Sequence, residues 1–204
     1  MRNMLVVQLC TILLISGALG GMFVFTDVYN EVHSRIVSVL CLSCLKLQPK
    51  TDSAFTFTTA NGEPHPSFVL ENLTTGPIFL HYSADVCRAC DIMMPIIQDY
   101  LNVNYSKQEF FTKTITMKNT NFTYIYMNID HISKETRESL DIYDKANSSG
   151  VPMFTFITLG YDGGIIKPSY TSVYGEQPLT LIDGLTINMI EIYKQNQAGY
   201  IPHH

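Results

Sequence analysis

Residues 83–95 read SADVCRACDIMMP and follow an apolar segment, 77–82, that has the composition of a buried strand. Two cysteines, Cys87 and Cys90, stand three positions apart where the strand pattern gives way to a helix pattern. A thiol at the start of a helix lies over unpaired backbone N–H groups and the positive end of the helix dipole, which stabilise a thiolate. The segment therefore predicts a reactive Cys87 and a Cys90 that can close a reversible disulfide with it.

The same spacing allows two other interpretations of the pair. Paired cysteines hold zinc in some proteins, but a zinc site needs four ligands, and no second Cys or His pair follows at zinc-finger or zinc-ribbon spacing. A purely structural disulfide is also compatible with the sequence. We favour a redox-active pair because it lies between a strand and a helix, where a thiol becomes reactive.

This order of motifs resembles the thioredoxin-like oxidoreductases. In that family an apolar strand begins near a proline and leads into a Cys-x-x-Cys at the start of a helix. A further proline, five residues after the second cysteine, kinks that helix. Pro77, the Cys87–Cys90 pair and Pro95 stand at the corresponding positions here.

The resemblance continues downstream of the cysteine pair. Residues 122–130, FTYIYMNID, are similar to the family's next central strand. Residues 150–157, GVPMFTFI, are similar to the loop whose cis-proline faces the two cysteines and to the strand that follows it. The resemblance covers residues 51–197. It implies an α/β, thioredoxin-like fold, in which a central mixed sheet is flanked by helices.

The resemblance also implies an activity and its residues. The chain is expected to exchange thiols and disulfides with protein substrates, without a cofactor or a bound metal. Cys87 would attack, Cys90 would resolve the mixed disulfide, and Pro152 would contact the substrate through its backbone. His81 stands where the family often has a buried carboxylate that takes the proton of the second cysteine. A neutral imidazole can accept that proton, and a histidine that merely fills the strand is the other interpretation.

The residues around the cysteines depart from the family pattern. Val86 replaces the usual tryptophan, and Arg88-Ala89 replaces Gly-Pro between the cysteines. Since the two inner residues tune the reduction potential, the sequence does not decide whether the protein reduces, oxidises or isomerises disulfides. Arg88 is expected to favour a thiolate at Cys87, and Asp85 and Asp91 to oppose it.

A membrane segment is expected at the N-terminus. Residues 5–25 contain no charge, and at 1.5 Å per residue a helix of this length spans a bilayer. We predict a single transmembrane signal anchor over residues 1–27. Arg2 favours a cytoplasmic N-terminus with the thioredoxin-like domain outside the cytoplasm. The alternative is a secreted protein, released after cleavage of a signal peptide near residues 18–20.

Residues 28–50 form an apolar juxtamembrane segment that carries a second Cys-x-x-Cys, Cys41 and Cys44. These cysteines could relay electrons between the first pair and a membrane redox partner. They could also be small apolar residues of a hydrophobic helix. We favour this interpretation because their neighbours Leu40, Leu42 and Leu45 supply no cation and no helix N-terminus to activate a thiol. The domain itself is expected over residues 51–204.

Charge and composition limit the partners. A net charge of −5, with scattered Lys and Arg, argues against nucleic-acid binding. The alternative to an enzyme is a thioredoxin-like binding module without turnover, which handles copper or holds clients. His81, Met93 and Met94 near the cysteines suggest copper, whereas methionines on a helix are more often core residues. The four sequons at Asn72, Asn104, Asn121 and Asn147 are compatible with a domain outside the cytoplasm.

Periodicity and turn residues predict the other elements. Alternation predicts a strand over 54–59, and a short helix is expected over 67–72. A helix is expected over 91–102 after the cysteine pair. Residues 104–121 show no convincing period and are expected to form a polar insertion, a loop that faces the substrate.

The C-terminal third has clearer signals. Ser133 is expected to cap a helix that runs to Lys145. A hairpin turn at residues 160–164 should lead into a last strand, 165–170. Pro178 should open the final helix at its first turn, where its missing N–H costs nothing. The buried stripe of this helix is expected to comprise Leu179, Ile182, Leu185, Met189 and Ile192.

Overall fold

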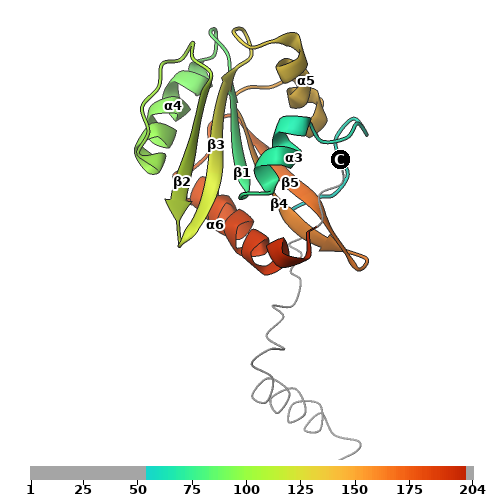
Figure 1. The fold of residues 1–204 in the computed structure, drawn as a ribbon. Helices are drawn as coiled ribbons and strands as arrows, with labels where there is room; N and C mark the ends of the chain where they lie inside the picture. Colours follow the sequence, from blue (N-terminus) through green and yellow to red (C-terminus); the bar gives the residue numbers. More distant parts are fainter. Residues whose placement is uncertain (1–53, 201–204) are drawn as a thin grey trace, which may run out of the picture. The chain divides into compact units, whose positions relative to one another are not determined.

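A computed structural model describes residues 54–200, in which five strands form one mixed sheet with helices on both faces (Figure 1). The strand order is β2-β3-β1-β4-β5. The strands are β1 (Ile78–Ser83), β2 (Phe111–Met117), β3 (Thr120–Asn128), β4 (Met153–Asp162) and β5 (Ile165–Tyr174). The helices are α3 (Ser67–Leu73), α4 (Arg88–Leu101), α5 (Lys134–Tyr143), α6 (Leu179–Asn196) and the short η1 (Gln197–Gly199). The predicted central mixed sheet with flanking helices is confirmed.

The predicted anchor over 1–27, the segment 28–50 and the second cysteine pair lie outside the described residues. Within residues 54–200, no helix is both long enough and apolar enough to cross a bilayer.

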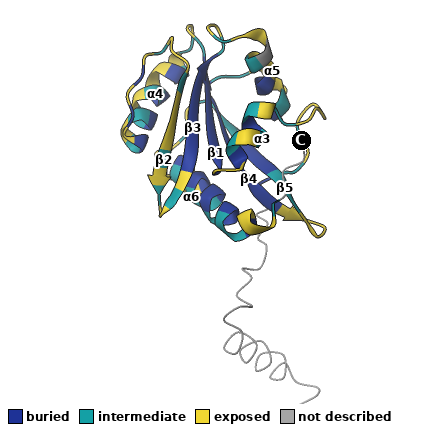
Figure 2. Ribbon diagram, in the orientation of Figure 1, coloured by how far each residue is buried: buried dark blue, intermediate teal, exposed yellow. Residues whose placement is uncertain are grey.

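The central strands form the buried middle of the sheet. β1 runs parallel to β3 and antiparallel to β4, and all six of its residues are buried. A strand covered on both faces needs apolar side chains on both, so β1, β3 and β4 consist of nearly continuous apolar and aromatic runs. β2 lies at one edge and is largely exposed (Figure 2).

Two hydrophobic clusters fill the layers above and below the sheet. Phe79 of β1 packs with Met93 of α4 and Met189 of α6. The next residue, Leu80, belongs to the other cluster, with Val69 of α3 and Leu140 of α5. Successive side chains of a strand point to opposite faces, so β1 contributes to both clusters.

Residues 104–121 are not a simple loop, as the sequence predicted, but contain strand β2. This strand pairs antiparallel with β3 over its whole length. Its turn to β3 uses Lys118 and Asn119, both in the left-handed conformation with φ of 49° and 60°. The element was missed because an edge strand exposes most of its side chains, so it lacks a regular apolar alternation.

The strand predicted over 54–59 is reduced to one isolated bridge. Thr56 exchanges two backbone hydrogen bonds with Tyr170 of β5, at 2.8 and 2.9 Å. Pairing towards residue 58 would next need an N–H from Pro168, which has none. The prediction of a strand was therefore wrong, although Phe55 is buried in the core.

The remaining helices and turns agree with those predicted from the sequence, with small differences in their bounds. The helix after the cysteines begins at Arg88, three residues earlier than expected, and contains Pro95. Ser133 caps α5 by accepting from the Thr136 N–H at 3.1 Å. The predicted hairpin turn is confirmed, with Gly163 and Gly164 at positive φ.

Helix α6 differs in its first turn only. Pro178 occupies the N-terminal capping position, directly before the first turn. Leu179 is 42% exposed, so the buried stripe begins at Ile182 and continues through the other three predicted residues.

Candidate functional site

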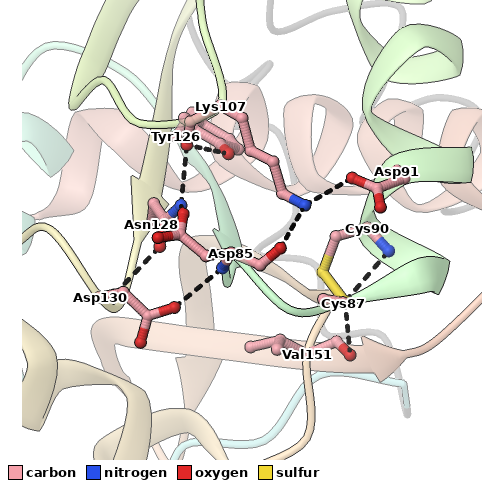
Figure 3. The surroundings of a disulfide bond; sticks show 9 residues. All are labelled: Asp85, Cys87, Cys90, Asp91, Lys107, Tyr126, Asn128, Asp130 and Val151. Atoms are coloured by element: carbon pink, nitrogen blue, oxygen red, sulfur yellow. Dashed lines mark hydrogen bonds and ion pairs between the residues drawn. A yellow bond between two sulfur atoms is a disulfide. The ribbon is translucent and has the colours of Figure 1, made fainter.

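The two cysteines of the 83–95 segment lie at the start of α4 and are joined in a disulfide (Figure 3). Cys87 caps the helix in an extended conformation, and the Cys90 N–H donates to Cys87 Sγ over an N to Sγ distance of 3.1 Å. Cys87 is partly exposed, whereas Cys90 is fully buried. A partner molecule can therefore reach Cys87 and not Cys90.

The loop before β4 lies beside the disulfide. Its Val151–Pro152 peptide bond is cis, as the resemblance implied. The Val151 carbonyl oxygen lies 3.4 Å from Cys87 Sγ, and Pro152 is buried. A disulfide sulfur carries no proton, so this approach is a contact in the oxidised protein; a reduced Cys87 thiol could donate to the same oxygen.

His81 lies in the middle of β1 and is completely buried. Its ring packs against Tyr126 of β3 and Phe154 of β4, at centroid distances of 5.1 and 4.7 Å. Both neighbours belong to the hydrophobic cluster that the buried face of α4 joins. Burial lowers the pKa of His81 to about 3, so the imidazole is neutral at ordinary pH.

Only one nitrogen of His81 has a partner in the described part of the chain. Nδ1 lies 2.9 Å from the Tyr124 hydroxyl, which in turn lies 2.6 Å from the Tyr105 hydroxyl. Nε2 is buried and unpaired among residues 54–200. Since a neutral imidazole carries one proton, the direction of hydrogen bonding along this row decides whether Nε2 is an N–H donor or an acceptor.

A polar network borders the loop that precedes Cys87. The Asp85 carboxylate accepts from Asn128 Nδ2 at 2.9 Å and lies 2.9 Å from His131 Nε2. The Asp85 N–H donates to Asp130 at 2.8 Å. The Asn128 hydrogen bond, followed by His131 and the Lys107 charge, lowers the pKa of Asp85.

Lys107 connects this network to α4. Its Nζ lies 2.5 Å from Asp91 Oδ1 and donates to the Asp85 carbonyl at 2.8 Å. Its own carbonyl accepts from the Tyr126 hydroxyl at 2.8 Å and from Asn128 Nδ2 at 2.9 Å (Figure 3). No sequence pattern indicated this role, because Lys107 lies in the segment interpreted as a loop.

One part of this network could have been found from the sequence. Strands β1 and β3 are parallel, so their carboxyl ends meet at the same edge of the sheet. Asp85 follows β1, and Asn128 and Asp130 stand at the end of β3. Two apolar strands ending in polar residues therefore predict contacts between these side chains.

The other residues singled out near the cysteines fall into two groups. Val86 and Arg88 are exposed, Val86 almost completely, and Arg88 forms no ion pair within residues 54–200. Met93 is buried in the core, as its helical position favoured. No group of three or more His, Cys, Asp or Glu side chains in the described part of the chain is arranged to hold a metal ion.

Two solved structures similar to this chain are thioredoxins. Thioredoxin O2 from Arabidopsis thaliana, in the oxidised state, has 16% sequence identity and a TM-score of 0.33 over 60% of this chain and 84% of that one. Thioredoxin from Aeropyrum pernix has 17% identity and a TM-score of 0.34 over 71% of this chain and 98% of that one. By sequence, the chain matches no protein-family model and no curated protein.

Proposed function

We propose that this chain is a thioredoxin-like thiol–disulfide oxidoreductase that acts on protein disulfides through Cys87 and Cys90. The asymmetry of the pair carries the proposal. Cys87 is accessible at the start of α4 and receives the Cys90 N–H, whereas Cys90 is buried behind it. A sulfur in this setting is favoured as the thiolate, which is the form that attacks disulfides.

In the reducing direction the cycle has two exchange steps. The Cys87 thiolate attacks one sulfur of a substrate disulfide; a mixed disulfide forms, and the other substrate sulfur leaves as a thiolate that takes up a proton. Cys90 then loses its proton and attacks Cys87 Sγ, which releases the second substrate thiol. Two electrons pass to the substrate, and the protein is left with the Cys87–Cys90 disulfide. The oxidising direction is the reverse.

His81 is proposed as the acceptor of the Cys90 proton. Its imidazole is neutral, and its buried Nε2 is unpaired among residues 54–200. In the form in which Nδ1 donates to Tyr124, Nε2 has the free lone pair that a proton acceptor needs. Burial opposes a charged imidazole, so the proton would stay at His81 only briefly.

The loop at Val151 and Pro152 is proposed to contact the substrate. Val151 O lies 3.4 Å from Cys87 Sγ, so a substrate sulfur bonded to Cys87 comes within reach of this backbone. A polypeptide that carries that sulfur can hydrogen-bond to main-chain groups there. Backbone recognition of this kind accepts many sequences and suits an enzyme with protein substrates.

We further propose that residues 1–27 anchor the protein in a membrane, with the domain outside the cytoplasm. The uncharged run over 5–25 supports an anchor. Asn104, Asn121 and Asn147, three of the four sequon asparagines, are exposed, as acceptors of a glycan must be. Retention in the membrane pellet after a carbonate wash tests the anchor; a soluble form that begins near Gly21 would establish cleavage instead.

The activity is tested in both directions on the full chain. Wild-type protein should reduce a protein disulfide with a dithiol as donor, or oxidise a reduced protein when supplied as the disulfide. Cys87→Ser should abolish both reactions. The matched control replaces both Cys41 and Cys44 by Ala and should leave turnover nearly unchanged, because we do not expect those thiols to relay electrons. No turnover by wild-type protein in either direction would favour a binding module and overturn the proposal.

A further inference from the structure

Lys107 is held at both ends beside the cysteine pair. Its carbonyl is fixed by the Tyr126 hydroxyl and the Asn128 amide of β3, and its ammonium group by Asp91 and the Asp85 carbonyl. Only 24% of its side chain is exposed. A lysine on a loop normally moves freely in solvent, so four contacts to three separate segments define one position for this charge (Figure 3).

The ion pair of Lys107 reaches the end of α4 that Cys87 caps. Asp91 belongs to the first turn of α4, the same helix end that the Cys87 sulfur caps. A carboxylate there is favoured by the helix dipole, but its negative charge disfavours a second anion, the Cys87 thiolate, at the same end. Lys107 pairs with that carboxylate and compensates its charge.

The other ionisable groups around this helix end are placed differently. The Asp85 carboxylate accepts from Asn128 Nδ2 at 2.9 Å and lies 2.9 Å from His131 Nε2, and Asp130 accepts from the Asp85 N–H. Arg88 is exposed, as is Asp91 at 60% of its side chain, but Arg88 forms no ion pair within residues 54–200. Among residues 54–200, Lys107 is therefore the cation whose ion pair reaches the first turn of α4.

We propose that Lys107 is a positioning residue that keeps Cys87 reactive by neutralising Asp91 at the start of α4. The inference takes from the proposed function only that Cys87 is the reacting thiol. From the sequence, Arg88 was expected to favour the thiolate, and Lys107 had no assigned role.

The test is the titration of the Cys87 thiol in the full-length reduced protein. Alkylation by iodoacetamide is followed against pH and quantified on the peptide that carries Cys87, so that the other cysteines do not interfere. Lys107→Met should raise the pKa of Cys87 by roughly 0.5–1 unit and slow alkylation at neutral pH about 3- to 10-fold. Lys107→Arg should stay near wild type. Lys113→Met is the matched control, because Lys113 also reaches a loop carbonyl, that of Asn102, from outside this network.

A second variant separates charge from structure. Asp91→Asn removes the anion and should lower the pKa of Cys87. Asp91→Asn combined with Lys107→Met removes both charges and should return the pKa close to the wild-type value, although the ion pair is lost. If the pKa of Cys87 in the double variant remains as high as in Lys107→Met, or if Cys87 in Lys107→Met titrates as in wild type, the proposal is wrong.

The midpoint potential of the Cys87–Cys90 couple gives an independent readout. A less stable thiolate disfavours the reduced form, so Lys107→Met should make the potential more negative, by about 30 mV for a tenfold change in the equilibrium. Both readouts need no substrate protein. A chain without turnover would therefore refute the proposed function and still allow this inference to be judged.

Discussion

The Cys90 N–H points at the Cys87 sulfur, with 3.1 Å between nitrogen and Sγ. This donor stays in place when the disulfide is opened, because it belongs to the first turn of α4. The two sulfurs therefore differ in both exposure and stabilisation. We therefore expect Cys87 to attack the substrate and Cys90 to resolve the mixed disulfide, and single substitutions separate these two roles.

Cys90→Ser should accumulate mixed disulfides between Cys87 and substrate proteins, because Cys87 can attack but nothing resolves the product. Cys87→Ser should give no such adducts, since the buried Cys90 is not accessible to a protein substrate. Non-reducing gels of the two variants with a substrate protein test this. Adducts on Cys87→Ser alone would reverse the assignment of roles.

Two glycines make a matched pair for a stability test. A Cβ on Gly184, exposed in α6, would meet no atom within 4 Å, so Gly184→Ala should raise the free energy of unfolding by roughly 0.5–1 kcal/mol. A Cβ on Gly76 would collide with the backbone carbonyl of Asn121. Gly76→Ala should lower stability by about 1–3 kcal/mol. Urea unfolding of both variants measures the two changes, and equal effects would contradict the packing described here.

The cap of α5 can be tested in the same way. Ser133 Oγ accepts from the Thr136 N–H, which no group of the helix can satisfy. Ser133→Ala should lower the free energy of unfolding by about 1 kcal/mol. Ser67→Ala is the control, since Ser67 is exposed at the start of α3 and provides no cap. A loss of the same size in both variants would show that the Ser133 hydrogen bond does not contribute.

The sequence predicted the parts of this molecule that depend on neighbours along the chain. The cysteine pair, the Ser133 cap and the Gly163-Gly164 turn are local, so spacing and residue type suffice. Strand β1 was found as an apolar run, and β3 and β4 through the resemblance; all three are buried on both faces and need such long apolar runs.

The parts that were missed depend on residues far apart in the sequence. The two side-chain contacts of Lys107 reach back 16 and 22 residues, and no local pattern indicates them. Strand β2 gains its structure from pairing with β3 and not from its own alternation. The bridge at Thr56 fails to extend because of Pro168, more than a hundred residues later.

The fully buried His81 and the partly buried His65 make stability depend on pH. Burial lowers the pKa of His81 to about 3 and that of His65 to about 4, from 6.5 in an unfolded chain. Below pH 6.5 the unfolded chain binds protons that the folded protein does not. Stability is therefore complete above pH 6.5 and falls as the pH decreases towards 4 for His65 and towards 3 for His81.

We predict that His81→Phe removes the contribution of His81 to the pH dependence of stability and leaves that of His65. Each histidine should add about 1.4 kcal/mol per pH unit to the slope of unfolding free energy between pH 5.5 and 4.5, where the unfolded imidazole is protonated and the folded one is neutral. Phe fits among the aromatic neighbours of residue 81, and the Tyr124 hydroxyl keeps its bond to Tyr105. Urea unfolding at pH 7.0, 5.5 and 4.5 compares the slopes of wild type and variant. The carboxylates contribute equally to the slopes of wild type and variant, so their effect cancels when one slope is subtracted from the other. An unchanged slope in His81→Phe would mean that His81 is protonated in the folded protein at these pH values, and the neutral imidazole proposed as proton acceptor would have to be abandoned.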